Sequence, residues 1–311
     1  MKPLRPNRAI AIDGGGIKGV VAARALSALE EYLGIESRKI FDLAAGTSTG
    51  AILAAGIGAG LTGAAMHRLY THLGPAIFKR SWRTWLWPLS RYRYRHEPLE
   101  RALRQFLGAG VMGDFWDGDA PIDVVMTTFD VVENRTRFIK PWKETYASWP
   151  IVKSVLASSS VPTTFPPVEG RYVDGGVGAY ANPCYVAAYE ARFVLDWDPR
   201  DTTLISLGTG RSPHTMDPDD ARGMWPWQWL QPVLGAFMQS ADDQQVHLVD
   251  TFFEGLDFRR FQVDLREPIG MDDVSKMADL TAYGDTLGQM ILDDVVDRTV
   301  EITALRPRSR R

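Results

Sequence analysis

The sequence Gly46-Thr47-Ser48-Thr49-Gly50 stands between two segments of contrasting type. Phe41–Ala45 before it is typical of a buried strand, and Ala51–Ala55 after it consists of good helix formers. A strand, a tight turn with serine between two glycines, and a helix form the arrangement called a nucleophile elbow. The glycines let strand and helix approach while the hydroxyl stays accessible. We therefore expect Ser48 to be a catalytic nucleophile; a residue that only caps the helix is the alternative.

A glycine-rich stretch, Asp13–Gly19, follows the predicted first strand Arg8–Ile12 and precedes helically spaced apolar residues over Val20–Leu33. Its backbone N–H groups would favour an anion, either a dinucleotide phosphate or the oxyanion of an attacked carbonyl. The dinucleotide fingerprint needs an acidic residue at the end of the second strand, and Asp42 comes too early. Since the loops after the first two strands of a parallel sheet open on one edge, an oxyanion hole is favoured over phosphate binding or a plain turn. The candidate donors are Gly14, Gly15 and Gly16.

Composition limits the function further. Of the 311 residues, 45% are hydrophobic and 23% charged, as in an ordinary globular protein, and the net charge is −3. A nucleic-acid polymer is not expected as a partner, because it would require a basic surface. The single cysteine, Cys184, fits a reducing compartment, and Met1–Arg8 lacks the apolar core of a signal peptide. Residues 43–61 predict a buried helix rather than a membrane span, so we expect a cytoplasmic protein.

Asp174 is the candidate partner of Ser48. It follows the short predicted strand Arg171–Val173 and precedes Gly175 and Gly176, which allow close backbone approach behind the carboxylate. The alternative is an Asp-Gly turn in which the carboxylate bonds only to its own backbone.

Basic and aromatic residues alternate between Phe78 and Arg104. Cations beside tryptophan and tyrosine are typical of a contact with anionic lipid. They are also typical of a site for a nucleotide or single-stranded nucleic acid. A third interpretation is an insertion with a solvated basic face. The candidate contact residues are Trp82, Arg83, Trp85, Trp87, Arg91, Arg93 and Arg95.

Strand and helix patterns continue toward the carboxyl terminus, and no repeat, linker or shift in composition marks a domain boundary. The predicted elements are strands over Ile122–Thr128 and Thr203–Leu207 and helices over Ile151–Ser158, Pro232–Phe253 and Met277–Val296. We expect residues 1–311 to form one α/β domain with an Arg/Trp-rich insertion at about 79–121.

Taken together, Asp13–Gly19, Gly46–Gly50 and Asp174–Gly176 resemble the motifs of the patatin-like phospholipase family, and the chain looks like a bacterial member. Ala157–Phe165 and Ser206–Gly210 are similar to further recurrent segments, so the resemblance covers most of the chain. It implies a three-layer α/β/α fold with a central, mostly parallel sheet. It also implies hydrolysis of acyl esters, usually in lipids.

The resemblance further implies a Ser-Asp dyad without histidine. A Ser-Asp-His triad needs a histidine after the acid. His214 and His247 follow it, but neither has a glycine-rich or strand-end setting. In the dyad, Asp174 acts as general base toward Ser48, with its pKa raised in a dry site. No metal or other cofactor is implied, and Lys18, where many members carry arginine, would supply a cation to support the anion.

We expect a serine acyl hydrolase of the phospholipase A or lysophospholipase type, acting on phospholipid or lysophospholipid at the surface of an anionic membrane. The alternative is a ligand-sensing or nucleotide-binding module on the same sheet. The two combine in some bacterial members of the family, which are antiphage effectors activated by a cyclic dinucleotide. The Arg/Trp-rich segment would then be the sensor. The sequence leaves the oligomeric state open.

Overall fold

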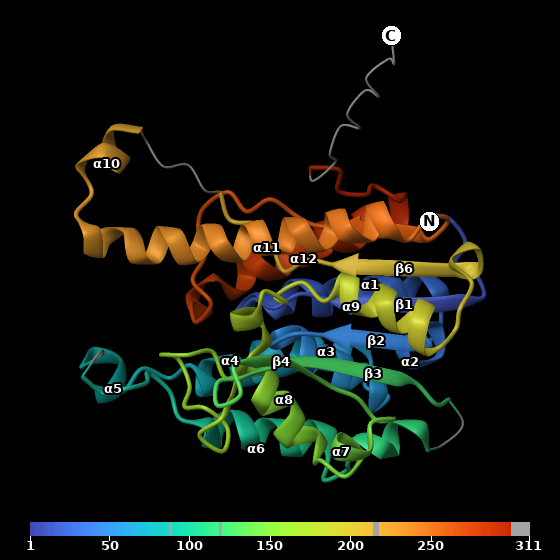
Figure 1. Ribbon diagram of the computed structural model, residues 1–311, viewed down its shortest axis with the longest axis horizontal. Helices are drawn as coiled ribbons and strands as arrows, with labels where there is room; N and C mark the ends of the chain where they lie inside the picture. The colour runs from blue at the N-terminus through green and yellow to red at the C-terminus, as the bar shows by residue number, and fades with distance from the viewer. Residues whose placement is uncertain (87–88, 118–119, 214–217, 300–311) are drawn as a thin grey trace.

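The computed structural model describes residues 1–86, 89–117, 120–213 and 218–299, so Trp87 and His214 lie outside the described residues. A seven-stranded sheet forms the centre of the molecule, with helices on both sides (Figure 1). Strands β1, β2, β3, β6 and β7 are parallel, whereas β4 is antiparallel to β3. In spatial order the main path is β4 (Arg135–Ile139), β3 (Asp123–Asp130), β2 (Leu43–Gly46), β1 (Asn7–Ile12), β6 (Thr202–Leu207) and β7 (Asp257–Phe261).

The remaining strand, β5 (Tyr172–Asp174), pairs antiparallel with the second half of β3. On one edge of β3, β2 covers only the first half, up to Gly46 opposite Met126, while β4 lines the second half of the other edge. β5 therefore continues on the β2 side, with Asp174 opposite Thr128. The two short strands run toward each other, so their carboxyl ends nearly meet along β3.

Alternation along the strands sends side chains into two separate cores. In β1, Ile10 and Ile12 join one apolar cluster, whereas Ala9 and Ala11 join another. None of the four is more than 1% exposed. Burial on both faces explains why the parallel strands are continuous apolar runs. The predicted α/β fold, with a mostly parallel sheet between helical layers, is confirmed.

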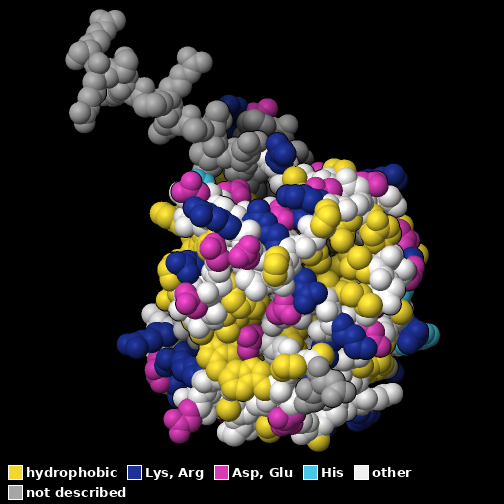
Figure 2. Space-filling view, turned by 90° about the vertical axis from the view of Figure 1, so that its right-hand side faces the viewer, with side chains coloured by type: hydrophobic (Ala, Val, Ile, Leu, Met, Phe, Trp, Pro, Cys, Tyr) yellow, Lys and Arg dark blue, Asp and Glu magenta, His cyan; other side chains and the backbone are white. Residues whose placement is uncertain are grey.

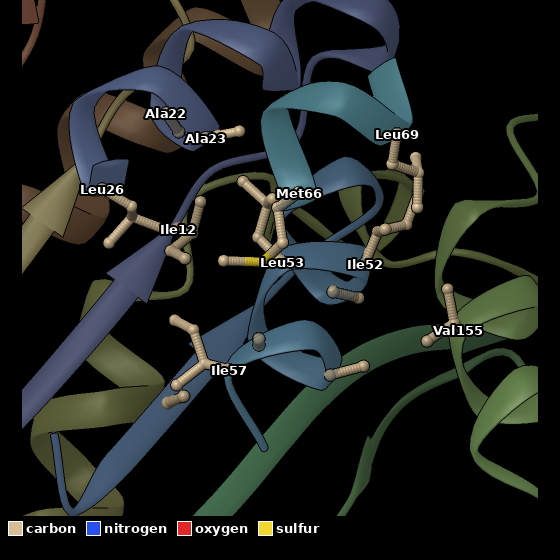
Figure 3. Packing of buried hydrophobic residues seen from close by; sticks show 14 of the residues in the cluster. Ile12, Ala22, Ala23, Leu26, Ile52, Leu53, Ile57, Met66, Leu69 and Val155 are labelled. Atoms are coloured by element: carbon tan, nitrogen blue, oxygen red, sulfur yellow. The ribbon is translucent and has the colours of Figure 1, made fainter. Parts of the chain in front are cut away.

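The larger cluster joins β1 to several helices, through side chains that include Ile12, Leu26, Leu53 and Met66 (Figure 3). The longer helices that contribute to it are α1 (Gly19–Leu33), α3 (Thr49–Gly58), α4 (Gly63–Ile77), α6 (His96–Leu107), α8 (Ile151–Ser159) and α12 (Met277–Asp293). The smaller cluster lies on the other face, under α9 (Cys184–Tyr189) and α11 (Leu230–Phe252).

The segment from 79 to 121 contains α5 (Trp82–Trp85), α6 and the 3-10 turn η2 (Met112–Trp116). α6 is amphipathic and buries Leu99, Leu103 and Leu107, so this helix belongs to the larger core. No helix among the described residues is both long and apolar enough to cross a bilayer.

Short helical elements complete the described chain. They are η1 (Gly16–Lys18), α2 (Ser37–Ile40), α7 (Glu144–Ala147), η3 (Gly175–Gly178), the π-helix η4 (Glu190–Val194), η5 (Pro199–Asp201), α10 (Pro218–Gly223), η6 (Pro226–Trp229) and η7 (Val274–Lys276).

Candidate active site

Ser48 lies on a strained turn between β2 and α3. Its φ of 57° and ψ of −122° are unusual for a residue with a side chain, as a nucleophile elbow requires. A Cβ atom on Gly46 would collide with the Gly50 carbonyl, and one on Gly50 would collide with the Ile12 carbonyl. Both glycines of the motif are therefore sterically required. The Ser48 amide donates to Ser158 Oγ at 3.0 Å, which ties the turn to the end of α8.

Asp174 reaches the same place from the opposite direction, at the carboxyl end of β5. Its amide donates to the Ser160 carbonyl at 3.1 Å, and its Oδ1 accepts from the Gly176 amide at 2.8 Å. Its Oδ2 is buried, and none of the described residues gives it a hydrogen bond of ordinary geometry. Gly175 is packed so closely on Thr127 that a Cβ atom there would collide with Oγ1. Only glycine therefore fits behind the carboxylate.

The environment of Asp174 suits a general base. Burial raises its pKa to about 6, although the nearby Ser48 hydroxyl and the Gly176 amide both act to lower it. The Ser48 hydroxyl is thus near enough to the carboxylate to lower its pKa, although Oδ2 has no hydrogen bond of ordinary geometry to a described residue. Catalytic hydrogen bonds commonly tighten only when substrate is bound. A carboxylate with a pKa near 6 is ionised at neutral pH and remains basic enough to accept a proton.

The glycine-rich loop lies directly against Ser48, since a Cβ atom on Gly14 would be 3.2 Å from that of Ser48. The Gly14 amide, however, donates to the Ala181 carbonyl at 2.9 Å and is therefore occupied. Among the described residues, no such acceptor is found for the amides of Gly15 and Gly16. The candidate oxyanion donors therefore narrow from three glycines to these two.

A buried ion pair holds the start of this loop. Arg260 of β7 donates to both carboxylate oxygens of Asp13, at 2.8 and 2.5 Å, and both side chains are almost fully buried. Burial raises the pKa of Asp13, against the opposing effect of the guanidinium. Burial and the Asp13 carboxylate together raise the pKa of Asp242 on α11 to about 8. Lys18 lies half-buried at the other end of the loop, where burial lowers its pKa despite the charge of Asp242.

Ser48 opens onto an apolar pocket of about 600 Å³, a volume that includes the solvent at its mouth. The pocket lies between α3, α4, α6 and the loop that follows α8. Its wall includes Ile52, Leu69, Leu99 and Phe165. Such a wall gives a hydrocarbon chain an apolar environment and gives a polar ligand few hydrogen bonds.

The Arg/Trp-rich segment begins at Phe78, which lines this pocket. Trp82 and Trp85 on α5 are 59% and 84% exposed, and the Arg83 guanidinium lies over the Trp82 ring at 4.7 Å. Arg93 pairs with Asp272 at 3.5 Å. Arg95 immediately precedes α6. Arg91, with a φ of 63°, lies on the turn between α5 and α6.

Sequence reasoning missed one histidine near the site. His96 Nε2 is 2.9 Å from Ser160 Oγ, and its ring stacks on Phe165 in the pocket wall. No motif marks this position, because the contact joins segments 64 residues apart. His247 lies on α11, where it contacts Thr251 one turn on. The described residues contain no group of three or more side chains arranged to hold a metal ion.

Comparisons with known proteins agree with this geometry. A profile described as "Patatin-like phospholipase" matches residues 10–188. An "Intracellular phospholipase A2" from Caenorhabditis elegans is 32% identical over 67% of this chain and 20% of its own length. An "85/88 kDa calcium-independent phospholipase A2" from Mus musculus is 27% identical over 89% of this chain and 38% of its own. These alignments thus span well under half of the two animal relatives.

A bacterial relative matches over more of its own length. The "cUMP-AMP-activated phospholipase" of Escherichia coli is 31% identical over 76% of this chain and 75% of its own. The residues matched by the profile include the Gly loop, the turn at Ser48 and Asp174. The fold brings these three together where β1, β2 and β5 end. The chain belongs to the patatin-like phospholipase family.

Proposed function

We propose that the chain is a serine acyl hydrolase of the phospholipase A or lysophospholipase type. The observation that carries the proposal is that Ser48, with the Asp174 carboxylate beside it, opens onto an apolar pocket. An acyl chain placed in this pocket would bring its ester carbonyl to Ser48 and leave the polar headgroup outside. The apolar wall favours a long hydrocarbon chain over a polar substrate.

The reaction follows from the roles of two side chains and one loop. Asp174 accepts the hydroxyl proton while Ser48 Oγ attacks the ester carbonyl, and the amides of Gly15 and Gly16 donate to the developing oxyanion. The tetrahedral intermediate collapses, the proton passes to the leaving alcohol, and the acyl group stays on Ser48. Asp174 then takes a proton from water, whose oxygen attacks the acyl-serine. Fatty acid is released and Ser48 regains its proton.

The substrate is proposed to be presented by an anionic membrane, at its cytoplasmic face. Three apolar side chains of the exposed turn around α5, those of Trp82, Trp85 and Leu89, are 59%, 84% and 84% exposed, and Arg83 lies among them. α5 projects from the end of the molecule toward which β2 and β6 point (Figure 1). The opposite end carries acidic and basic side chains intermixed with apolar patches (Figure 2). Aromatic rings beside a cation suit the headgroup boundary of anionic lipid.

Hydrolysis is tested by comparing wild type with Ser48→Ala and Asp174→Asn. Fatty acid release from phospholipid vesicles and from micellar lysophospholipid should fall roughly a thousandfold or more in both variants. A fluorophosphonate probe should label wild type and not Ser48→Ala. Activity near the wild-type level in either variant would show that the dyad is assigned wrongly. A wild type that neither releases fatty acid nor reacts with the probe would favour a ligand-binding module over a serine hydrolase.

Docking is tested separately with Trp85→Ser/Leu89→Ser. We expect this variant to co-sediment less with phosphatidylglycerol vesicles while hydrolysing a soluble short-chain ester at the wild-type rate. Tyr32→Ser removes a 58% exposed aromatic side chain from α1, away from this surface, and should sediment like wild type. Equal sedimentation of all three proteins would contradict the docking surface.

A second proposal concerns regulation, namely that a cyclic dinucleotide activates the hydrolase. It is supported by the relative named a cUMP-AMP-activated phospholipase, which aligns over about three quarters of both chains. Fatty acid release measured with and without a panel of cyclic dinucleotides tests it. Activity that rises only when one of them is present would support activation. Full activity of the purified protein without any nucleotide would contradict it.

A further inference from the structure

A second loop closes on the oxyanion loop from the carboxyl-terminal side. The Ile17 amide donates to the Met271 carbonyl at 2.8 Å. Gly16, with a φ of +62°, is packed against the same carbonyl, so that a Cβ atom there would collide with it. Met271 also lines the pocket into which Ser48 opens. The turn that presents the Gly16 amide is therefore held in place by the backbone of Met271.

The residue next to Met271 is tied to the Arg/Trp-rich segment. Asp272 Oδ2 accepts from the Tyr94 hydroxyl at 2.9 Å and pairs with Arg93 at 3.5 Å. Tyr94 is itself fixed, since its amide donates to the Thr164 carbonyl at 2.9 Å. Its ring is buried against Phe165 of the pocket wall. Burial and the Asp272 carboxylate raise the pKa of Tyr94 to about 12, so the hydroxyl stays protonated and donates throughout the neutral range.

We propose that Asp272 is a positioning residue of the oxyanion loop, because it anchors the Met271 carbonyl, which holds Ile17 and Gly16, to the rigid ring of Tyr94. The inference rests on the hydrolase function proposed above. Asp272 takes no part in the chemistry. Its effect is exerted through two backbone contacts on the direction of the Gly16 N–H.

The position of the Met271 carbonyl thus depends on one acceptor atom, Oδ2 of Asp272. A carbonyl that is free to shift no longer fixes the Gly16 turn, and misplacing an oxyanion donor by about 1 Å can cost up to about a hundredfold in rate. The Tyr94 bond needs only an acceptor oxygen on residue 272, which asparagine also supplies. The half-exposed pair with Arg93 contributes less, because solvent screens it.

The test compares Asp272→Ala, Asp272→Asn, Tyr94→Phe and the double variant Asp272→Ala/Tyr94→Phe on a soluble butyrate ester. We expect kcat to fall about tenfold in Asp272→Ala and severalfold in Tyr94→Phe, with KM within twofold of wild type. Asp272→Asn should retain most of kcat. The double variant should resemble Asp272→Ala, because both substitutions break the same bond. Asp285→Ala, which removes the partner of Arg24 from the exposed face of α12, serves as the matched control.

A readout independent of activity separates this proposal from the proposed function. Hydrogen–deuterium exchange of the peptide over residues 14–19 should speed up in Asp272→Ala, because the Met271 carbonyl that accepts from the Ile17 amide is then free to shift. Exchange should stay at the wild-type rate in Asp285→Ala. Unchanged exchange together with unchanged kcat would overturn the proposal. So would an additive double variant, or a loss in Asp272→Asn as large as that in Asp272→Ala. A wild type with no esterase activity, either with or without cyclic dinucleotides, but with faster exchange in Asp272→Ala would refute only the hydrolase function.

Discussion

Replacing Asp174 by asparagine should abolish activity and at the same time stabilise the fold at neutral pH. Asparagine has the same shape as aspartate and keeps a side-chain oxygen. That oxygen can still accept from the Gly176 amide, as Oδ1 of Asp174 does at 2.8 Å in wild type. The substitution also removes a buried negative charge. In wild type, Oδ2 of this carboxylate has no hydrogen bond of ordinary geometry to a described residue. Functional groups held in such unfavourable settings commonly reduce stability.

The size of the gain follows from the difference in pKa between the folded and unfolded states. Asp174 has a pKa of about 6 in the folded protein, against a reference value of 3.8. Each pKa unit corresponds to about 1.4 kcal/mol, so ionisation at pH 8 lowers the free energy of unfolding by about 3 kcal/mol. The folded pKa is the higher one, so the penalty is small near pH 4, grows between pH 4 and 6, and is constant above. At pH 5 it amounts to about half of its full value.

Thermal unfolding of wild type and Asp174→Asn from pH 4 to 8 measures this directly. The melting temperature of the variant should exceed that of wild type by several degrees at pH 8, and the difference should shrink toward pH 4. Asp130→Asn is a control of opposite sign. Despite the effect of burial, hydrogen bonds from Arg171 lower the pKa of Asp130, so this carboxylate stabilises the fold at neutral pH and loses that effect in acid. A pH-independent difference, or an Asp174→Asn variant less stable than wild type at pH 8, would refute the reasoning.

Two further predictions use the same electrostatics. Because Asp174 must be ionised to act as a base, kcat/KM for a soluble ester should fall about tenfold per pH unit below about pH 6, and a profile flat down to pH 4.5 would exclude Asp174 as the base. Arg260→Met should cost about 3–5 kcal/mol of unfolding free energy, measured in urea, because it leaves the Asp13 carboxylate buried without its cation. The double variant Asp13→Leu/Arg260→Met should recover much of that loss. If it does not, the unpaired Asp13 carboxylate is not what destabilises Arg260→Met.

Local patterns predicted the elements that position the nucleophile. The first strand was expected over Arg8–Ile12 and is observed over Asn7–Ile12, and the helix expected from Val20 to Leu33 begins one residue earlier. The strand, turn and helix around Ser48 are also present. These features depend on short-range periodicity and on glycines in tight contacts, which the sequence displays directly. The catalytic role of Ser48 stays a prediction.

Long-range partners could not be predicted in this way. β7 reads Asp-Phe-Arg-Arg-Phe, a pattern that suggests a solvated edge, yet Arg259 and Arg260 are 2% and 6% exposed. Each is buried because a carboxylate meets it, and for Arg260 that partner is Asp13, 247 residues away. The occupied amide of Gly14 has the same origin, since its acceptor Ala181 comes from a distant turn. Neither propensity nor spacing encodes such contacts.

The sheet itself accounts for the meeting of Ser48 and Asp174. β2 and β5 lie end to end on one edge of β3 and run in opposite directions, so a residue after one and a residue ending the other must converge. The oxyanion loop is supported differently, by Arg260 beneath Asp13 and by Met271 against Gly16. Since Asp272 links Met271 to Tyr94, a change in the Arg/Trp-rich segment can reach the oxyanion loop without moving β2 or β5. If Asp272 positions the loop as proposed, we therefore expect Asp272→Ala to lower kcat without shifting the pH at which kcat/KM falls.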